Sequence, residues 1–398
     1  MVGRSQDDSG ARRSHGSPRL RKIVFCLVGV IAGVGASLLI CEVVVRVFHL
    51  APVFDVLYQA KFQISENPVL RYEMRPGSRD DDVVISSAGL RDREFATPKP
   101  RDVYRIVVIG DSVTFGFRLE QQQAFPKMVE ALLNRHSPAG SPTYEVLNLG
   151  VNGYNTTQAV EALRVRGLRF EPDLIIYAYV LNDPQGYSLE AEALAVLRAR
   201  AEKPLHMARY FPRSGLLQML SAQLQRLSPA HRRLYLSEPG YVAFDAGTHC
   251  AYFHALHNNE ETWTRVTDGM ATLARLTSEP RSVPVLVAVI PIDTEQGFSP
   301  YPMQDLHDKV AAEARNEGFQ TLDLAPVFRL VSAELDGEFY LDFLHPNLKG
   351  NEVLAVALLK WLSESADLPG GGFDFERIRS GNDFDAQIAE ALTADKRE

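Results

Sequence analysis

The chain has 398 residues, of which 45% are hydrophobic and 23% are charged, as in an ordinary globular protein. Its formal net charge of −8, without a basic stripe or interleaved basic and aromatic residues, argues against nucleic-acid binding. Cys26 and Cys41 lie in or beside an apolar N-terminal segment and Cys250 is alone in the remainder, which excludes an intradomain disulfide framework.

The first distinctive segment is an apolar run near the N-terminus. Ile23 to Ile40 contains no charged residue, and at about 1.5 Å per residue it approaches the roughly 30 Å of a membrane core. Several basic residues precede it in the polar segment 1–22, which we expect to be disordered. By the positive-inside rule, the sequence predicts a cytoplasmic tail at 1–22, a transmembrane signal-anchor helix at 23–48 and an extracytoplasmic remainder.

Three other interpretations of this segment were weighed. A cleaved signal peptide is disfavoured by the length of the run and by the lack of an Ala-x-Ala-like cleavage site. A lipoprotein signal would use Cys41, but Ile40 stands where a small residue is expected. A buried core helix is disfavoured because nothing before it could form a domain. An uncleaved anchor is therefore favoured.

An accessory segment of short strands and turns is expected at 49–103, and apolar and amphipathic segments alternate after it. Runs such as Leu174 to Leu181 are apolar throughout, as in strands buried on both faces. The alternation predicts an α/β fold, a three-layer sandwich with a parallel sheet covered by helices on both faces. Strands are expected at 104–109, 144–149, 173–181, 284–290 and 319–324, and helices at about 124–135, 156–168, 261–277, 303–316 and 348–363.

Two segments depart from this alternation. Residues 184–260 are too long for an ordinary connection, so a helical insertion is expected there, within a main domain at 104–365. Residues 366–398 contain three consecutive glycines directly after Pro369 and end acidic, which is typical of a C-terminal tail. A short helix is expected within that tail at 384–393.

A candidate nucleophile follows the first strand of the series, in the turn Gly110-Asp-Ser112. This turn lies at the C-terminal edge of the predicted sheet, where open α/β sheets bind ligands. The N–H groups of a helix N-terminus beside it can stabilise an anion. Ser112 is therefore the candidate nucleophile, and Asp111 is expected to hold the turn by accepting backbone hydrogen bonds.

Further groups suited to acyl transfer lie at later strand ends and in one loop. Gly153 follows the second strand with a backbone N–H, and Asn182 follows the third with an amide donor. Asp342 and His345 share the loop before the last helix, where the carboxylate can fix the tautomer and orientation of the imidazole. Gly153 could equally be needed for a positive φ, which does not exclude the oxyanion role, and Asn182 could be a structural cap.

In these blocks the chain resembles the GDSL-type esterases, also called the SGNH hydrolase superfamily. The matching blocks are Gly110-Asp-Ser112, Gly153, Asn182-Asp183 and Asp342-x-x-His345, over roughly residues 104–362. The resemblance implies a flavodoxin-like parallel sheet, no metal or organic cofactor, and hydrolysis of esters carried by small molecules, glycans or lipids. One position departs from the family pattern, since Val180 stands where glycine is usual.

The resemblance also implies a role for each residue. Ser112 would attack the acyl carbonyl, and His345 would take its proton and later protonate the leaving alcohol. Asp342 would orient His345. The backbone N–H groups of Ser112 and Gly153, with the side-chain amide of Asn182, would hold the oxyanion.

The other histidines are not assigned to a site. His249, His254 and His257 lack a carboxylate partner at a recognised metal-ligand spacing, so a solvated loop or helix face is the favoured interpretation. His206 and His307 have no partner visible in the sequence and are expected at the surface.

The predicted function is that of a membrane-anchored serine esterase. It would be a single-pass protein of the cell inner membrane with its catalytic domain in the periplasm, acting on acyl or acetyl esters of a glycan or lipid. An O-acyltransferase of envelope polysaccharide would use the same triad but pass the acyl group to a sugar hydroxyl. A non-catalytic glycan-binding module on the same fold is disfavoured by the presence of all four blocks.

Overall fold

The computed structural model describes residues 18–48, 61–80, 83–186, 214, 216–217, 249–278, 282–294, 296–365, 368–369, 373–381 and 383–394. The chain divides into two compact units. One consists of Met1–Val53 with Lys203–Ser228, and the other of Phe54–Glu202 with Pro229–Glu398.

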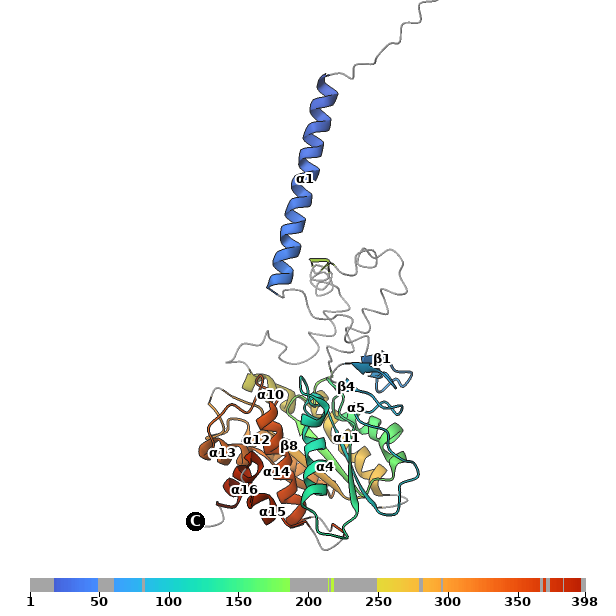
Figure 1. Ribbon diagram of the computed structural model, residues 1–398, viewed down its shortest axis with the longest axis vertical. Helices are drawn as coiled ribbons and strands as arrows, with labels where there is room; N and C mark the ends of the chain where they lie inside the picture. Colours follow the sequence, from blue (N-terminus) through green and yellow to red (C-terminus); the bar gives the residue numbers. More distant parts are fainter. Residues whose placement is uncertain are drawn as a thin grey trace, which may run out of the picture. The chain divides into compact units, whose positions relative to one another are not determined.

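The first unit contains helix α1 (Pro18–Val47), drawn in blue in Figure 1. Its segment Lys22–Val47 is long and apolar enough to cross a membrane, and no other helix among the described residues is. Large apolar side chains such as Phe25 and Leu39 are exposed along it, as on a helix that is apolar all round. A membrane anchor and a signal sequence both contain such a helix.

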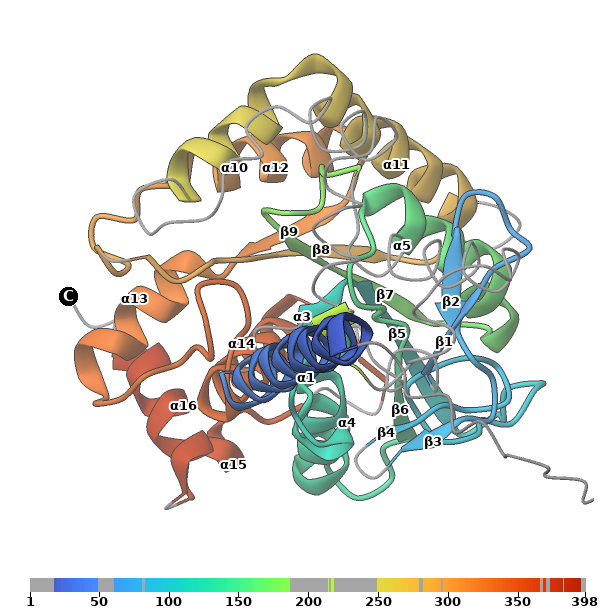
Figure 2. The same cartoon turned by 90° about the horizontal axis from the view of Figure 1, so that it is seen from above.

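The second unit is built on a parallel sheet with the strand order β6-β5-β7-β8-β9 (Figure 2). In chain order this is 2-1-3-4-5, the flavodoxin-like arrangement, so the predicted α/β fold class is confirmed. The order reverses between β5 and β7, and open sheets bind ligands in the crevice at that point. The strands are β5 (Val103–Gly110), β6 (Thr143–Asn148), β7 (Leu174–Val180), β8 (Val285–Ile290) and β9 (Gln320–Asp323).

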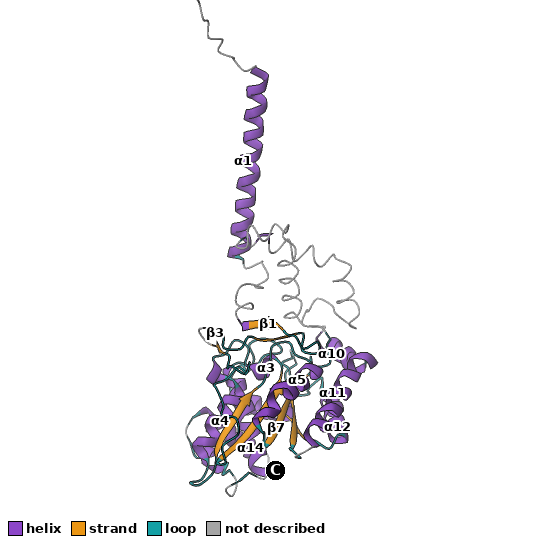
Figure 3. Cartoon of the chain, turned by 90° about the vertical axis from the view of Figure 1, so that its right-hand side faces the viewer, coloured by secondary structure: helices purple, strands orange, loops and turns teal. Residues whose placement is uncertain are grey.

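Helices cover both faces of this sheet, as Figures 2 and 3 show. One layer contains α4 (Phe125–His136), α13 (Ala325–Glu334), α14 (Leu348–Ser365), α15 (Glu376–Arg379) and α16 (Phe384–Ala394). The other contains α5 (Thr156–Ala162), α10 (His249–Asn258), α11 (Glu260–Ser278) and α12 (Gln304–Asn316).

The apolar pattern of the sequence explains this layering. Every residue of β7 is buried, and since neighbouring side chains on a strand point to opposite faces, both faces must be covered. The covering helices are amphipathic: α4 buries Phe125, Val129, Leu132 and Leu133, which share one face of the helix.

The accessory segment before β5 forms two short antiparallel pairs. These are β1 (Phe62–Ile64) with β2 (Tyr72–Met74), and β3 (Arg79–Asp80) with β4 (Val83–Val84). Their buried side chains form a second apolar cluster together with Phe115, Val151 and Tyr154, which follow the strands β5 and β6. The Tyr72 hydroxyl donates to Asn152 O at 2.6 Å, which ties this segment to the loop after β6.

Most expected elements occur within a few residues of their predicted ends. The helix expected at 156–168 is α5, which passes into a π-helical turn at Leu163–Gly167. The short helix expected at 384–393 is α16, whose Ile388 and Leu392 are buried in the main core. Helices α10, α13 and α15 were not expected. Most of the helical insertion predicted at 184–260 lies outside the described residues.

Candidate active site

Ser112 begins the short helix α3 (Ser112–Phe115) directly after β5. Asp111 is the N-cap of this helix, and its carboxylate accepts the Val113 N–H at 2.9 Å, as the sequence predicted for this residue. Gly110 is needed at the strand end because a Cβ there would collide with the Thr114 hydroxyl and lie 2.9 Å from Ala178 O. The turn therefore holds the serine at the carboxyl edge of the sheet, beside the crevice between β5 and β7.

The Ser112 hydroxyl lies beside an imidazole from a distant part of the chain. Its Oγ is 2.9 Å from Nε2 of His345. The same Oγ is 3.3 Å from Oδ2 of Asp111, a longer contact. With Nε2 as the acceptor, the imidazole can take the hydroxyl proton as the oxygen attacks a carbonyl carbon.

His345 is held in turn by Asp342 in the same loop. The imidazole Nδ1 lies 2.9 Å from both carboxylate oxygens, and the backbone N–H groups of Leu344 and His345 donate to Oδ1 at 2.9 Å. Burial alone would raise the pKa of Asp342, but these hydrogen bonds and the His345 charge outweigh it and lower the pKa to about 2. An ionised Asp342 fixes a proton on Nδ1 and leaves Nε2 free to accept one.

The loop that carries this pair is closed on itself. Leu341 N donates to His345 O at 2.8 Å, and Tyr340 pairs with Pro346 in an antiparallel bridge. The Tyr340 hydroxyl donates to Pro291 O at 2.6 Å, just beyond the end of β8. The Asp342 side chain is 39% exposed, so the pair lies close to the protein surface.

One aromatic contact to this pair has no signal in the sequence. The Phe117 ring lies with its centroid 4.3 Å from that of the His345 imidazole, at an interplanar angle of 33°. The guanidinium carbon of exposed Arg118 lies over the same Phe117 ring, 5.2 Å from its centroid. Phe117 therefore limits the orientations open to the imidazole, together with Asp342.

The side chain of Asn182 also points to the serine turn. Its Nδ2 donates to Asp111 Oδ2 at 2.9 Å, while its Oδ1 has no hydrogen-bond partner among the described residues. Complete burial raises the pKa of Asp111, opposed by the hydrogen bonds from Asn182 and Val113. The amide carries two N–H groups, so one remains for another acceptor.

Gly153 lies in the loop after β6 with a φ of +72°, a conformation that favours glycine. This loop is fastened to β5, because Leu149 N donates to Val108 O at 2.9 Å and Val151 N donates to Gly110 O at 3.2 Å. The Gly153 N–H donates to no acceptor within the described part of the chain. It is therefore available to an incoming group.

Asp183, next to Asn182, is fully buried. Its Oδ2 lies 2.7 Å from the Tyr177 hydroxyl, which is also 2.8 Å from Thr156 Oγ1. Burial, reinforced by the nearby Asp111 charge, raises the pKa of Asp183 well above its usual value. The sequence alone does not indicate these contacts, because Tyr177 and Thr156 come from other elements, β7 and α5.

Two expectations for the other histidines are wrong. His257 was assigned to a solvated face but is completely buried, with Nε2 2.9 Å from the Tyr179 hydroxyl. His307 was expected at the surface but is also buried, with Nδ1 2.7 Å from Asp323 Oδ1. Within the described ranges, no group of three or more His, Cys, Asp or Glu side chains is arranged to hold a metal ion. His206 lies outside the described residues.

Comparisons with solved structures return esterases at low similarity. A two-domain esterase active on acetylated mannans has 15% identity and a TM-score of 0.38; the match covers 67% of this chain and 50% of that one, so this chain spans half its length. A lipolytic G-D-S-L family protein from Veillonella parvula has 11% identity and a TM-score of 0.34, covering 66% and 99%. A catalytic mutant of an acetylxylan esterase from Geobacillus stearothermophilus has 16% identity and a TM-score of 0.36, covering 65% and 93%.

The family assignment rests on a different comparison. No curated protein matches the chain. The model of the GDSL-like lipase/acylhydrolase family matches residues 108–353, which is more than half of the chain and contains Ser112, Asp342 and His345. The chain therefore belongs to the GDSL-like lipase/acylhydrolase family and is an ester-hydrolysing enzyme.

Proposed function

We propose that this protein is a membrane-anchored serine esterase that works outside the cytoplasmic membrane through a triad of Ser112, His345 and Asp342. The observation that carries the proposal is the unbroken chain of contacts from Ser112 Oγ to His345 Nε2 and from His345 Nδ1 to Asp342. A nucleophile, a base and a group that orients the base are the three parts that acyl transfer requires.

In the first half of the reaction, Ser112 Oγ attacks the ester carbonyl carbon while His345 Nε2 takes its proton. The carbonyl oxygen becomes an oxyanion, and the imidazolium is stabilised by ionised Asp342. When the oxyanion collapses, the C–O bond to the alcohol breaks and His345 returns the proton to the leaving oxygen. The acyl group then remains on Ser112.

Three donors are available to stabilise the oxyanion. The Ser112 N–H begins α3, and the first N–H groups of a helix have no intrahelical acceptor. The Gly153 N–H and the second N–H of the Asn182 amide complete the set. Asp111 supports this role because its bond to the first N–H fixes the direction of the amide.

In the second half, water attacks the acyl carbon while His345 Nε2 takes its proton. The bond between the acyl carbon and Ser112 Oγ then breaks, His345 returns the proton to Oγ, and the acid is released. The exposed Asp342 side chain supports a substrate in which the ester is carried on a large molecule, because this end of the triad lies near the surface. We assign the substrate to the acyl or acetyl esters of envelope glycans or lipids. The basic residues before α1 support residues 1–22 in the cytoplasm and the catalytic domain in the periplasm.

The anchor is tested separately from the chemistry. Membranes from expressing cells are washed with alkaline carbonate, and the N-terminus of the mature protein is sequenced. We expect the protein to stay in the membrane fraction with residues before Ile40 intact. A mature N-terminus beyond residue 40 would identify α1 as a cleaved signal.

The chemistry is tested with the full chain in detergent. Hydrolysis of p-nitrophenyl acetate, butyrate and octanoate is measured for the parent and for Ser112→Ala, together with labelling by a fluorophosphonate. We expect hydrolysis and labelling in the parent and neither in Ser112→Ala. Equal hydrolysis in both proteins would overturn the proposal. Transfer of the acyl group to an added sugar, in preference to water, would instead identify an O-acyltransferase.

A further inference from the structure

Two consecutive charged residues, Arg91 and Asp92, lie beneath the candidate site and take no part in the chemistry above. Both are 0% exposed. They belong to the segment between β4 and β5, upstream of the residues matched by the family model. Burial of a charge is costly unless the charge is fully hydrogen-bonded, so the partners of these side chains are informative.

Arg91 donates to backbone carbonyls at the C-terminal end of α3. Its guanidinium bonds to Phe115 O, to Gly116 O at 3.0 Å and to Leu119 O. It also lies over the Phe115 ring, with the guanidinium carbon 4.5 Å from the ring centroid. A cation at this end of a helix also interacts favourably with the helix dipole.

These bonds complete the hydrogen bonding of the helix that carries Ser112. Ser112 O and Val113 O accept backbone N–H groups from the following turn. Thr114 O accepts the Asn148 side-chain amide at 2.8 Å, and Arg91 satisfies Phe115 O. A helix of four residues has no intrahelical partner for most of its carbonyls. Its position therefore depends on Arg91 and Asn148.

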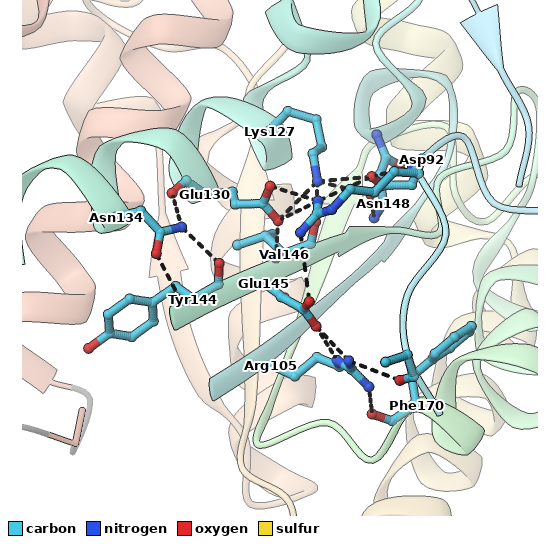
Figure 4. A network of polar contacts seen from close by, with 12 residues as sticks. Asp92, Arg105, Lys127, Glu130, Asn134, Tyr144, Glu145, Val146, Asn148 and Phe170 are labelled. Carbon is cyan, nitrogen blue, oxygen red and sulfur yellow. Dashed lines mark hydrogen bonds and ion pairs between the residues drawn. The ribbon is translucent and has the colours of Figure 1, made fainter. Parts of the chain in front are cut away.

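Asp92 supports the same helix, α3, indirectly through Asn148. Its carboxylate pairs with the buried Lys127 ammonium at 3.0 Å and accepts the Asn148 N–H at 3.1 Å (Figure 4). Lys127 also donates to Val146 O at 2.9 Å and to Glu130, so the ammonium joins α4 to the end of β6. Asp92 therefore fixes the backbone of Asn148, and the Asn148 side chain in turn bonds to α3.

Asn148 extends this connection into the loop that carries Gly153. Its Oδ1 accepts the Gly150 N–H at 2.9 Å. Gly150 packs directly on α3, because a Cβ there would collide with Phe115 N and lie 2.6 Å from Thr114 C. Consequently, the serine helix and the Gly153 loop are in backbone contact, and Asn148 bonds to both of them.

We propose that Arg91 and Asp92 are positioning residues that set the place of Ser112 and of the Gly153 N–H relative to each other. This inference rests on the proposed function, in which Ser112 attacks and Gly153 stabilises the oxyanion. A misplacement of about 1 Å can cost about 10²-fold in rate, so loss of either side chain should act on the chemical step. Lysine cannot replace Arg91, because it lacks the planar fork that bonds several carbonyls at once.

The chain offers a matched control in Arg105. This arginine is also 0% exposed, and it bonds to Phe170 O at 2.7 Å, to Glu145 and to Ala96 O. It lies near the start of β5, whereas Ser112 follows the end of that strand. Its replacement removes as much buried hydrogen bonding, but at the end of β5 that lies away from Ser112. Figure 4 shows Arg105 beside Glu145 and Phe170.

The experiment compares Arg91→Ala, Arg91→Lys and Asp92→Ala with Arg105→Ala and Arg105→Lys in the full chain in detergent. For each variant we measure the folded fraction by circular dichroism, kcat and KM for p-nitrophenyl acetate, and the rate of fluorophosphonate labelling. The Arg91→Ala measurements are repeated with methylguanidinium added below denaturing concentrations. Ser112→Ala is measured in parallel.

We expect Arg91→Ala and Asp92→Ala to lower kcat per folded molecule by about 10²-fold with little change in KM, and to slow labelling equally. Methylguanidinium should restore part of the Arg91→Ala loss. Arg105→Ala should lower the melting temperature but leave kcat per folded molecule at the parent value. If an alanine variant does not fold, Arg91→Lys against Arg105→Lys decides the question by the same criterion.

The proposal is overturned if the Arg91 and Arg105 variants lose only stability and keep the parent kcat per folded molecule. If Ser112→Ala is inactive in the same experiment, that result would refute the positioning role of Arg91 and Asp92 but would not affect the proposed function. Activity retained in Ser112→Ala, or a parent that neither hydrolyses nor labels, would refute the proposed function and the positioning with it.

Discussion

Among the described residues, two histidines meet an aspartate through Nδ1, and only one of these two imidazoles faces a nucleophile. In His345–Asp342 the Nδ1–carboxylate distance is 2.9 Å, and Nε2 meets Ser112 Oγ. In His307–Asp323 the corresponding distance is 2.7 Å, but the imidazole is completely buried and its Nε2 has no hydrogen-bond partner among the described residues.

The surroundings explain why the two pairs differ. Asp323 also accepts Gln304 Nε2 at 2.6 Å and Ala325 N at 3.0 Å, so the buried pair joins α12 to the end of β9 and the start of α13. The Tyr301 ring meets the His307 ring edge-on at 5.2 Å. A carboxylate that orients an imidazole is therefore not enough to identify a base; the second ring nitrogen must reach a reacting group.

The largest expected difference comes from removing each imidazole. His345→Ala should lower kcat by about 10⁴-fold or more, because it removes the base of the triad. His307→Ala should leave kcat unchanged and instead lower the free energy of unfolding by about 1–3 kcal/mol, since it removes the imidazole partner of half-buried Asp323 and leaves a cavity in the core. Turnover of p-nitrophenyl acetate and urea unfolding measure the two effects. A comparable loss of kcat in folded His307→Ala would contradict the distinction.

Replacing each carboxylate by an amide sharpens the same comparison. Asp342→Asn should lower kcat by up to about 10⁴-fold, because the amide favours the wrong imidazole tautomer. Asp323→Asn should leave kcat at the parent value.

With its pKa lowered to about 2, Asp342 stays ionised at neutral and mildly acidic pH. The parent's kcat/KM profile measured from pH 4 upward should therefore contain no limb from Asp342.

A smaller loss of kcat is expected when one oxyanion donor is removed. Asn182→Ala should lower kcat by about 10²–10³-fold, the usual effect of removing one such donor. Labelling of Ser112 by a fluorophosphonate should persist at a reduced rate, because the nucleophile and base remain. Unchanged kcat would assign Asn182 to holding Asp111 alone.

The last prediction concerns stability alone and extends the comparison to a third histidine, one with a buried ring and no carboxylate partner among the described residues. Burial lowers the pKa of His257 to about 4, below its ordinary value. The unfolded chain therefore binds a proton at this residue between about pH 6.5 and 4 while the folded chain does not, so stability should fall by about 3 kcal/mol as the pH drops through that window. Urea unfolding at several pH values, with His257→Gln as the control, should show a shallower slope in the variant.

Much of the fold followed from local pattern. Strands such as β7 are apolar along their whole length, and turn residues bound them, so their ends were predicted within a few positions. The order of the blocks around Ser112, Asn182 and His345 identified the candidate site, because the carboxyl ends of parallel strands meet at one edge. The pairing of Asp342 with His345 could also be predicted, because both residues lie in one short loop.

The features that were missed depend on contacts between distant elements. His307 pairs with Asp323 from the next strand, and His257 meets Tyr179 from β7, so neither environment leaves a mark near the histidine itself. Arg91 bonds to carbonyls more than twenty positions later, and no residue type is required to provide a carbonyl. A sequence indicates which side chains carry chemistry more readily than which ones support the backbone beneath them.

The closed loop from Tyr340 to Pro346 has a consequence for inhibition. Because Asp342 and His345 belong to one hydrogen-bonded loop, a ligand that displaces the loop would carry the imidazole and its carboxylate away together. The tautomer would be preserved, and only the separation between Ser112 Oγ and His345 Nε2 would change. A reversible inhibitor of this enzyme therefore needs no reactive group. It has only to bind so that the loop moves away from Ser112, because the serine would then lack a base.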